Sequence, residues 1–205
     1  MDKDQKDQNY FEEDEPEEKT PKASAVGSFF LALFDFVKTI VIVVILAFII
    51  RVFIIQPFIV EGQSMEPTFH NNDYLITEKV TYKFRTPERG EIVIFHPPDN
   101  TSVNYIKRII GLPGDTIEIK DGSIFVNSNE LTEKYLNSDE QTALSQGNQE
   151  KITLGEKEYY VFGDNRNHSR DSRELGPIPL DNLVSRVWVR LLPLDSMKAF
   201  AAVNY

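Results

Sequence analysis

Three segments of the 205-residue chain carry polar side chains whose types and spacing could do chemistry. In the first, residues 60–68 (VEGQSMEPT), Ser64 lies between a turn that contains Gly62 and the pair Pro67-Thr68. Glycine lets the backbone approach closely, and proline fixes its own φ angle. This arrangement suits an exposed hydroxyl whose neighbouring amides point at one oxygen, so Ser64 is a candidate nucleophile. The alternative is an ordinary serine in a turn.

The second segment, residues 105–115 (YIKRIIGLPGD), predicts a strand with a lysine among bulky apolar neighbours. Period-two alternation puts Tyr105, Lys107 and Ile109 on one face and Arg108 on the other. Burial would disfavour the ammonium and lower the pKa of Lys107 from about 10.4. A neutral amine can take the proton of a serine hydroxyl. The alternative is an edge-strand lysine that reaches into water.

The third segment, residues 159–173 (YYVFGDNRNHSRDSR), is an apolar strand that runs into a dense polar turn. Ordering such a turn is costly unless its groups pair with one another. Ser169 could donate to a lysine amine and aim it, which is the part of the third member of a catalytic triad. The alternative is a solvated, charged loop.

The charges of this turn suggest specific ion pairs. Asp164 is expected to meet Arg108 or Arg166, and Asp171 is expected to meet Arg173. Paired in this way, the turn would keep its charges satisfied while it is held close to the apolar strand.

Together the three segments closely resemble signal peptidase I, the Ser-Lys peptidase that removes signal peptides from exported proteins. The resemblance extends from Phe29 to about Pro193, and the motifs occur in the family's order. It implies a mainly β fold, a signal-peptidase-like mixed β-sheet catalytic domain with one N-terminal transmembrane helix. The matching stretches are GQSMEPT (62–68), RGEIVIF (89–95), YIKRIIGLPGD (105–115) and GDNRNHSRDSRELGPIP (163–179).

The resemblance also implies a role for each matching residue. Ser64 would be the nucleophile, Lys107 the general base and Ser169 the hydroxyl that orients the lysine. A lysine rather than a histidine at the base position is similar to the bacterial type of the family. The implied structural supports of the site are Asp164, Arg166, Asp171 and Arg173, with Arg108 paired to the acidic turn.

The substrate would be an extended peptide that adds as a strand beside the catalytic residues. The resemblance implies shallow apolar pockets for small side chains, in the Ala-x-Ala pattern, for which four residues are candidates: Phe58, Val60, Tyr105 and Ile106. Gly62 and Gln63 are also expected to bind substrate. Gly62 stands where some members have an oxyanion-hole serine, so a substitute donor is expected besides the Ser64 amide. Losing such a donor typically costs about 100- to 1000-fold in rate.

An apolar segment precedes these motifs. The 32 residues from Phe29 to Val60 hold seven of the fourteen phenylalanines and only three charges, at Asp35, Lys38 and Arg51. The two basic side chains could snorkel outward from the helix ends, which extends the segment able to cross a bilayer to roughly 20 residues. We expect an uncleaved anchor at residues 29–55, because no small-x-small cleavage site follows. The alternative is a buried core helix.

The basic residues on either side of the anchor suggest its orientation. Lys19, Lys22 and Lys38 lie on the N-terminal side, and after Arg51 no basic residue occurs before Lys79. By the positive-inside rule the N-terminus is cytoplasmic, and the catalytic domain lies outside the cell membrane, anchored by a single pass. The lipid bilayer and the signal peptides of exported precursor proteins are the expected partners.

The remaining chain divides by composition. Residues 1–28 are polar and acidic, with nine acidic residues against four lysines in 1–22, and are expected to be a disordered cytoplasmic tail. Residues 56–205 would form the catalytic domain, with a polar surface insertion at about 120–157. Asp121-Gly122 predicts a hairpin turn. Strands are expected at 56–60, 74–79, 91–95, 104–110, 116–119, 123–126, 158–162 and 183–191.

Composition excludes several classes of protein. The chain has no cysteine, so disulfides, thiolate catalysis and zinc-thiolate sites are ruled out. The three histidines form no HExxH pattern, and neither a metal nor an organic cofactor is expected. The net charge of −10 argues against binding nucleic acid.

Two other functions compete with signal-peptide cleavage. A self-cleaving repressor has a similar Ser-Lys core, but it would carry a DNA-binding helix-turn-helix and no anchor. A membrane-tethered binding module with a degenerate site would have lost Ser64 or Lys107, and both are present. His70 and His168 suggest a Ser-His-Asp triad, but no motif of the family requires them. Ser196-Met197 lacks the Pro-Thr that follows Ser64 and is interpreted as incidental.

Overall fold

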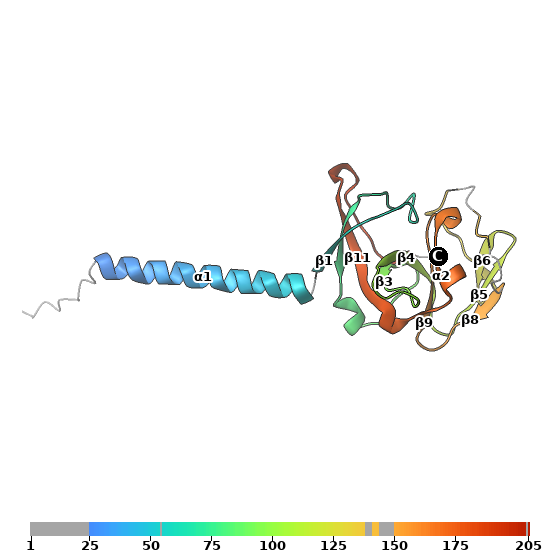
Figure 1. Ribbon diagram of the computed structural model, residues 1–205, viewed down its shortest axis with the longest axis horizontal. Coiled ribbons are helices and arrows are strands. Elements are labelled where there is room, and N and C mark those ends of the chain that lie inside the picture. Colours follow the sequence, from blue (N-terminus) through green and yellow to red (C-terminus); the bar gives the residue numbers. More distant parts are fainter. Residues whose placement is uncertain (1–24, 54, 138–140, 144–149, 204) are drawn as a thin grey trace, which may run out of the picture. The chain divides into compact units, whose positions relative to one another are not determined.

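The computed structural model describes residues 25–53, 55–137, 141–143, 150–203 and 205 (Figure 1). The chain divides into two units, Met1–Ile45 and Leu46–Tyr205. The predicted tail, residues 1–28, lies outside the described residues as far as residue 24, and the first helix already includes residues 25–28.

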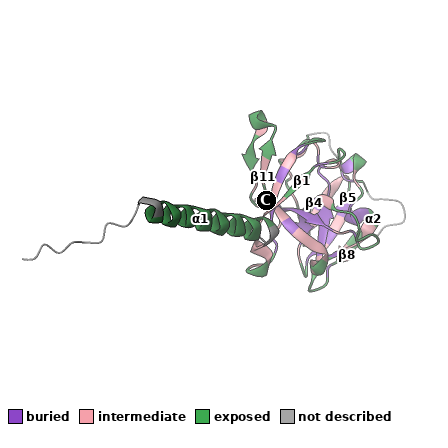
Figure 2. Ribbon diagram, turned by 60° about the vertical axis from the view of Figure 1, so that its left-hand side comes forward, coloured by how far each residue is buried: buried purple, intermediate pink, exposed green. Residues whose placement is uncertain are grey.

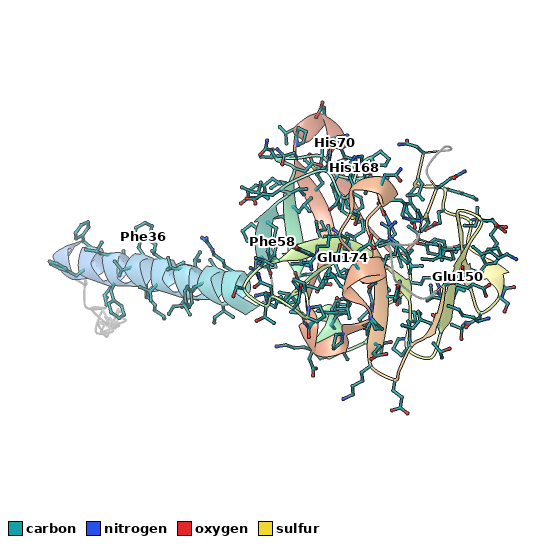
Figure 3. All side chains as sticks on the ribbon, turned by 45° about the vertical axis from the view of Figure 1, so that its right-hand side comes forward. Phe36, Phe58, His70, Glu150, His168 and Glu174 are labelled. Atoms are coloured by element: carbon teal, nitrogen blue, oxygen red, sulfur yellow. The ribbon has the colours of Figure 1, made fainter. Side chains whose placement is uncertain are left out.

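Helix α1, Ala25–Phe53, contains most of the apolar segment. Its 29 residues give a length of about 44 Å, more than the roughly 30 Å of a bilayer's hydrocarbon core. Among the described residues it is the one helix long and apolar enough to cross a membrane, over Gly27–Arg51. Its side chains, Phe36 among them, project outward and are exposed along the described length (Figures 2 and 3). A buried core helix would instead be covered by protein.

The larger sheet has eight strands among the described residues, in the order β1-β2-β11-β3-β4-β9-β10, with β12 paired to β11. All pairings of this sheet among the described residues are antiparallel, and β4 lies between β3 and β9. The bounds are β1 Ile55–Ile59, β2 Tyr74–Glu78, β3 Ile92–Phe95, β4 Tyr105–Gly111, β9 Glu158–Phe162, β10 Ile178–Pro179, β11 Leu183–Leu192 and β12 Lys198–Ala199.

The smaller sheet has four strands in the order β7-β6-β5-β8. The predicted hairpin is present: Asp121 and Gly122 both have positive φ, and Lys120 pairs with Ser123 across the turn. Part of the segment expected as a surface insertion, residues 120–157, therefore belongs to a sheet. The bounds are β5 Thr116–Lys120, β6 Ser123–Val126, β7 Asn129–Glu130 and β8 Lys151–Thr153.

Short helical turns complete the described part of the chain. The helix α2 spans Ser172–Leu175, directly after the polar turn that follows β9. The 3-10 turns are η1 Thr81–Lys83, η2 Arg166–His168, η3 Leu180–Asn182 and η4 Leu194–Ser196.

Apolar side chains from both sheets meet in the core. Ile110 of β4 and Phe162 of β9 pack with Ile117 and Ile124 of the smaller sheet, all at most 1% exposed. Figure 2 shows β4 among the buried parts of the molecule, while α1 is exposed. The predicted mainly β fold with one N-terminal apolar helix is confirmed. Strand β4, which carries Lys107, pairs with β3 on one side and with β9 on the other.

Candidate active site

Ser64 lies in the loop between β1 and β2, and backbone hydrogen bonds close the base of that loop. The amide of Val60 donates to the carbonyl of Asp73 at 2.9 Å, and the amide of Asn72 donates back to Val60 at 2.8 Å. Within the loop, directly after Ser64 and five residues after it, Met65 and Phe69 are buried, at 1% and 0% exposure. Two apolar anchors therefore fix a loop that still leaves Ser64 partly accessible.

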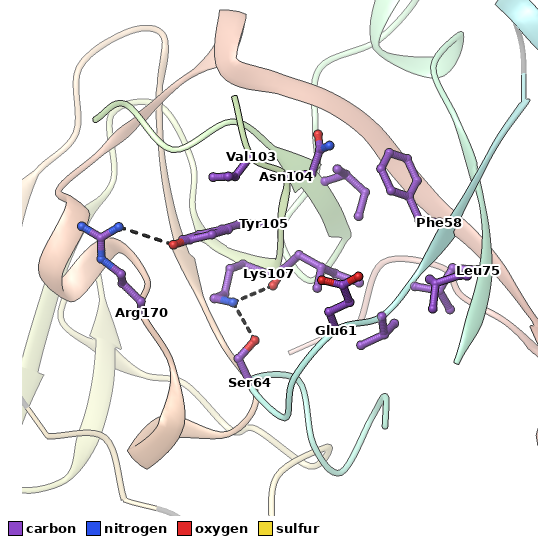
Figure 4. A pocket seen from close by; sticks show the side chains of 13 residues that line it. Phe58, Glu61, Ser64, Leu75, Val103, Asn104, Tyr105, Lys107 and Arg170 are labelled. Carbon is purple, nitrogen blue, oxygen red and sulfur yellow. Dashed lines mark hydrogen bonds between the residues drawn. The ribbon is translucent and has the colours of Figure 1, made fainter. Parts of the chain in front are cut away.

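Lys107 reaches Ser64 across 43 residues of sequence. Its Nζ lies 2.8 Å from Ser64 Oγ and donates to the carbonyl of Ile106 at 2.8 Å (Figure 4). The whole residue is only 3% exposed. Burial lowers the pKa of Lys107 to about 8, although the charges of Asp171 and Asp164 act to raise that pKa. At mildly alkaline pH a large fraction of this amine is neutral and can accept the hydroxyl proton of Ser64.

The next residue of β4, Arg108, is equally buried but has a carboxylate partner. Its Nε and Nη2 donate to the two oxygens of Asp164 at 2.9 and 2.6 Å, and its Nη1 donates to Gly90 O at 3.0 Å. Burial by itself would lower the pKa of Arg108, but the hydrogen bonds and charge of Asp164 outweigh it and raise that pKa. Thr68 Oγ1 also donates to Asp164 at 2.5 Å, which links the loop of Ser64 to the polar turn.

Asp171 organises the end of the polar turn. It accepts hydrogen bonds from Arg173 Nε at 2.8 Å and from the amide of Gly163 at 2.9 Å, and it caps α2 by accepting from the Arg173 amide at 3.2 Å. Asp171 is 0% and Arg173 5% exposed. The expected Asp171–Arg173 pair is therefore present and fully enclosed.

Arg166 pairs with a residue outside the motifs. Of the two partners considered for Asp164, the structure joins Arg108, and Arg166 instead donates to both oxygens of Glu133, at 2.8 and 2.5 Å. Thr142 also accepts from Arg166. Glu133 and Thr142 lie in the polar stretch between β7 and β8, which the sequence predicts as a surface insertion or a small cap.

A stacking partner of Arg108 was missed as well. The centroid of the Tyr135 ring lies 3.9 Å from the Arg108 guanidinium carbon. Nothing in the sequence connects these residues to the catalytic turn, because the contacts depend on how the smaller sheet packs.

Ser169 lies next to the backbone of Ser64, and no hydrogen bond joins it to Lys107. Its Oγ is enclosed and has no hydrogen-bond partner among the described residues. A Cβ added to Gly163 would lie 2.1 Å from Ser169 Oγ and 2.5 Å from Ser64 O, so both crowd the glycine. The Ser64 carbonyl also accepts from the Asn165 amide at 3.1 Å. Glycine at 163 is what lets the polar turn approach the loop of Ser64 this closely.

A pocket of about 560 Å³ opens beside the pair of catalytic candidates. Four of the six residues expected to bind substrate line it: Phe58, Val60, Tyr105 and Ile106. Leu75 and Ile94 add apolar surface, and the charged side chains on the pocket wall besides Lys107 are Glu61 and Arg170 (Figure 4).

Gly62 and Gln63 do not line this pocket. Gly62 has a φ of +90° and its amide donates to Asn71 Oδ1 at 2.9 Å, so this amide is not free to serve as an oxyanion donor. The Gln63 carbonyl accepts from Asn165 Nδ2 at 3.2 Å, which again ties the loop to the polar turn. Both residues thus shape the loop rather than the pocket wall.

The histidines and the second Ser-Met pair lie apart from this arrangement. His70 and His168 are exposed (Figure 3), and His168 Nδ1 lies 3.2 Å from Asn165 Oδ1. Neither lines the pocket of Ser64. Ser196 lies in η4 and donates to Pro193 O at 3.3 Å. Among the described residues no group of three or more His, Asp or Glu side chains is arranged to hold a metal ion.

Comparison with known proteins gives consistent matches. Residues 33–192 match the family model described as signal peptidase, peptidase S26. A protein named probable signal peptidase I-2 from Synechocystis is 43% identical over 162 residues, which cover 77% of this chain and 72% of the relative. A signal peptidase I from Leptolyngbya laminosa is 38% identical over 196 residues, covering 91% of this chain and 94% of the relative.

A solved structure also matches part of the chain. The crystal structure of a signal peptidase I from Enterococcus faecalis is 31% identical, and the match covers 50% of this chain and 97% of that one with a TM-score of 0.43.

Proposed function

The chain belongs to the signal peptidase family, peptidase S26, whose members are peptidases, and from this premise we propose that it cleaves signal peptides with Ser64 as nucleophile and Lys107 as general base. The observation that carries the proposal is the 2.8 Å distance between Lys107 Nζ and Ser64 Oγ at the wall of an open pocket. Nucleophile and base within hydrogen-bond reach is what covalent catalysis by serine requires.

The reaction proceeds in two acyl transfers. Neutral Lys107 takes the hydroxyl proton as Ser64 Oγ attacks the scissile carbonyl, and it then gives that proton to the leaving amine. The signal peptide remains as an ester on Ser64. Lys107, neutral again, removes a proton from water, the water attacks the ester, and the proton returns to Ser64 Oγ as the peptide leaves.

The enclosed polar turn would keep the base in place. Asp171 and Arg173 are buried together, and the turn that they stabilise carries Ser169 next to Ser64. A rotation of the Ser169 hydroxyl towards the amine, when substrate enters, would give it the orienting role expected from the family. The same turn is also held by two ion pairs, Arg108–Asp164 and Arg166–Glu133.

The pocket favours small apolar side chains of an extended substrate. Phe58, Val60 and Leu75 present apolar surface in the same pocket as Ser64, which suits alanine-sized residues near the cleavage point. Strand β1 ends the order of the larger sheet and pairs with β2 on one side, so its other edge can accept a peptide strand. We therefore propose Ala-x-Ala-type cleavage sites.

Helix α1 is proposed to anchor the enzyme by a single pass, with the N-terminus cytoplasmic and the catalytic domain outside. The described length of α1 and the bias of basic residues towards its N-terminal side support this topology. Because β1 starts at Ile55, two residues after α1 ends at Phe53, the catalytic domain would begin at the membrane surface, where signal peptides arrive.

The test is processing of an exported precursor by the full chain in detergent. The native protein should release the mature product, whereas Ser64→Ala and Lys107→Ala should release none, since each removes half of the dyad. For the native protein, kcat/KM should rise with pH through about 8, where Lys107 becomes neutral. Equal product from all three proteins would exclude this assignment of the dyad.

The two competing functions raised by the sequence are not retained. The hypothesis of a self-cleaving repressor is rejected because the chain belongs to the signal peptidase family. Such a repressor would also lack an apolar helix like α1. A degenerate binding module is disfavoured because the two catalytic candidates are not only present but in contact.

A further inference from the structure

Arg170 connects two segments at the mouth of the catalytic pocket. It follows Ser169 on the polar turn, and its Nε donates to Glu174 Oε1 at 2.6 Å. Its Nη2 donates to Asp99 Oδ2 at 2.7 Å, and its Nη1 donates to the hydroxyl of Tyr105 at 3.4 Å. The guanidinium therefore joins the polar turn to the chain between β3 and β4 and to the first residue of β4.

The segment that carries Asp99 forms part of the pocket. Residues 96–104 leave the sheet after β3 and return to β4, and the last two of them, Val103 and Asn104, line the pocket. His96 Nδ1 lies 3.0 Å from the carbonyl of Val103, and Asn182 Nδ2 donates to the carbonyl of His96 at 2.8 Å. The base of this loop is thus closed by His96 and tied to η3, whereas its outer part is tied to the polar turn through the Asp99–Arg170 ion pair.

Tyr105 is a part of the pocket wall near the reacting groups. Its ring centroid lies 5.6 Å from Lys107 Nζ, and the ring packs edge-on against Phe95 at 6.0 Å. Phe95 holds one side of the ring, and Arg170 holds the hydroxyl at its far end. Figure 4 shows Arg170 bonded to the outer tip of Tyr105 on the side of the pocket away from Phe58.

We propose that Arg170 is a specificity-determining positioning residue, which fixes Tyr105 and the 96–104 loop and so limits the size of the substrate side chain accepted beside Ser64. This inference rests on the proposed function. Arg170 itself does not contact the reacting atoms, and its planar guanidinium reaches three partners at once, which a lysine ammonium on a flexible stem would not hold in one geometry.

The contacts of Arg170 are exposed, and this determines how large the effect can be. The side chains of Arg170, Asp99 and Glu174 are 41%, 53% and 53% exposed, so water and salt weaken each ion pair. Their loss should leave the protein folded and the dyad intact. It should release Tyr105 and the loop enough to widen the pocket.

The experiment compares two precursors that differ only in the residue before the scissile bond, alanine in one and valine in the other. The measured quantity is the ratio of their kcat/KM values with the full chain in detergent. In Arg170→Met, which keeps an unbranched apolar stem but removes the guanidinium and its donors, the valine-to-alanine ratio should rise about fivefold. Asp99→Asn removes the charge of one partner and Tyr105→Phe removes the hydroxyl of another, and each should raise the ratio about twofold.

Lys151→Met is the matched control. Lys151 forms an exposed ion pair with Glu118 at 3.1 Å in the smaller sheet, and its loss should leave the ratio unchanged. In about 1 M salt the ratio of the native protein should move towards that of Arg170→Met.

An unchanged ratio in Arg170→Met, or an equal fall in kcat/KM for both precursors, would overturn the inference while leaving the proposed dyad in place. Failure of the native chain to cleave either precursor would instead overturn the proposed function, so the two failures are distinguishable.

Discussion

The two faces of β4 each carry a buried basic side chain, and the pKa values of these two side chains shift in opposite directions. Lys107 and Arg108 are consecutive and each is 3% exposed, yet the pKa of Lys107 falls to about 8 while the pKa of Arg108 rises. On the Arg108 face, both oxygens of Asp164 accept from the guanidinium. On the Lys107 face, the amine meets a hydroxyl and a backbone carbonyl, both neutral.

Burial alone therefore does not make a base. A carboxylate bonded to a buried cation offsets the lowering of its pKa by burial, whereas neutral partners leave that lowering uncompensated. In this chain the acidic groups near Lys107 are committed elsewhere, Asp164 to Arg108 and Asp171 to Arg173. The paired arginines hold carboxylates close enough to influence the amine but do not let them bond to it.

The most severe way to break this comparison is Lys107→Arg. A guanidinium remains charged at any pH at which the protein is folded, so both faces of β4 would then carry a fixed cation. Precursor cleavage should fall by at least about 10⁴-fold and should not recover at high pH. The control is Lys120→Arg, an exposed lysine at the end of β5, which should cleave like the native protein. Activity of Lys107→Arg within tenfold of native would contradict the role of the amine.

Asp164→Asn attacks the other face. It leaves the Arg108 guanidinium buried without a counter-charge, which should lower the free energy of unfolding by about 3–5 kcal/mol. Urea denaturation followed by circular dichroism measures this. Glu88→Gln, which breaks a partly exposed ion pair with Arg85, should cost under about 1 kcal/mol. Similar losses of unfolding free energy in both variants would contradict the expectation that the buried Arg108–Asp164 pair contributes more to stability than an exposed pair.

Lys107→Met sharpens the comparison through stability. Folding lowers the pKa of Lys107 from 10.5 to about 8, so between these two pH values the unfolded chain binds more protons than the folded chain. The buried amine therefore destabilises the fold, and this effect is fully present below about pH 8. Replacing it by methionine should raise the free energy of unfolding at pH 7 by roughly 3 kcal/mol. The gain should shrink as pH rises from about 8 to about 10.5. Urea denaturation at several pH values checks this, and a gain that is independent of pH would contradict it.

Much of the fold follows from local pattern. All eight stretches expected as strands are strands, because each has an apolar or β-branched run bounded by turn residues. The pair Asp121-Gly122 predicted its hairpin because both positions need positive φ. The short strands β7, β8, β10 and β12 were not predicted. They have two or three residues each, too few to show a period, and exist through pairing with longer neighbours.

The candidate site was predictable only in part. The motifs indicated Ser64, Lys107 and the pairing of Asp171 with Arg173, since each residue stands in a distinctive local pattern. Glu133 and Tyr135 stand in an unremarkable polar stretch, and their contacts with Arg166 and Arg108 arise from packing of the smaller sheet. The choice of Arg108 over Arg166 as partner of Asp164 was likewise open.

The sequence by itself determined the types of group available: an alcohol, an amine between apolar neighbours, and a turn with charges of both signs. These could be predicted because strand alternation and turn chemistry act over a few residues. The tertiary structure decided which of those groups meet. Ser64 and Lys107 are 43 positions apart, and Thr68 and Asp164 are 96 apart, so no local rule relates them. The depressed pKa of Lys107 depends on the exclusion of water and on which carboxylates are already paired, and both are properties of the packed molecule.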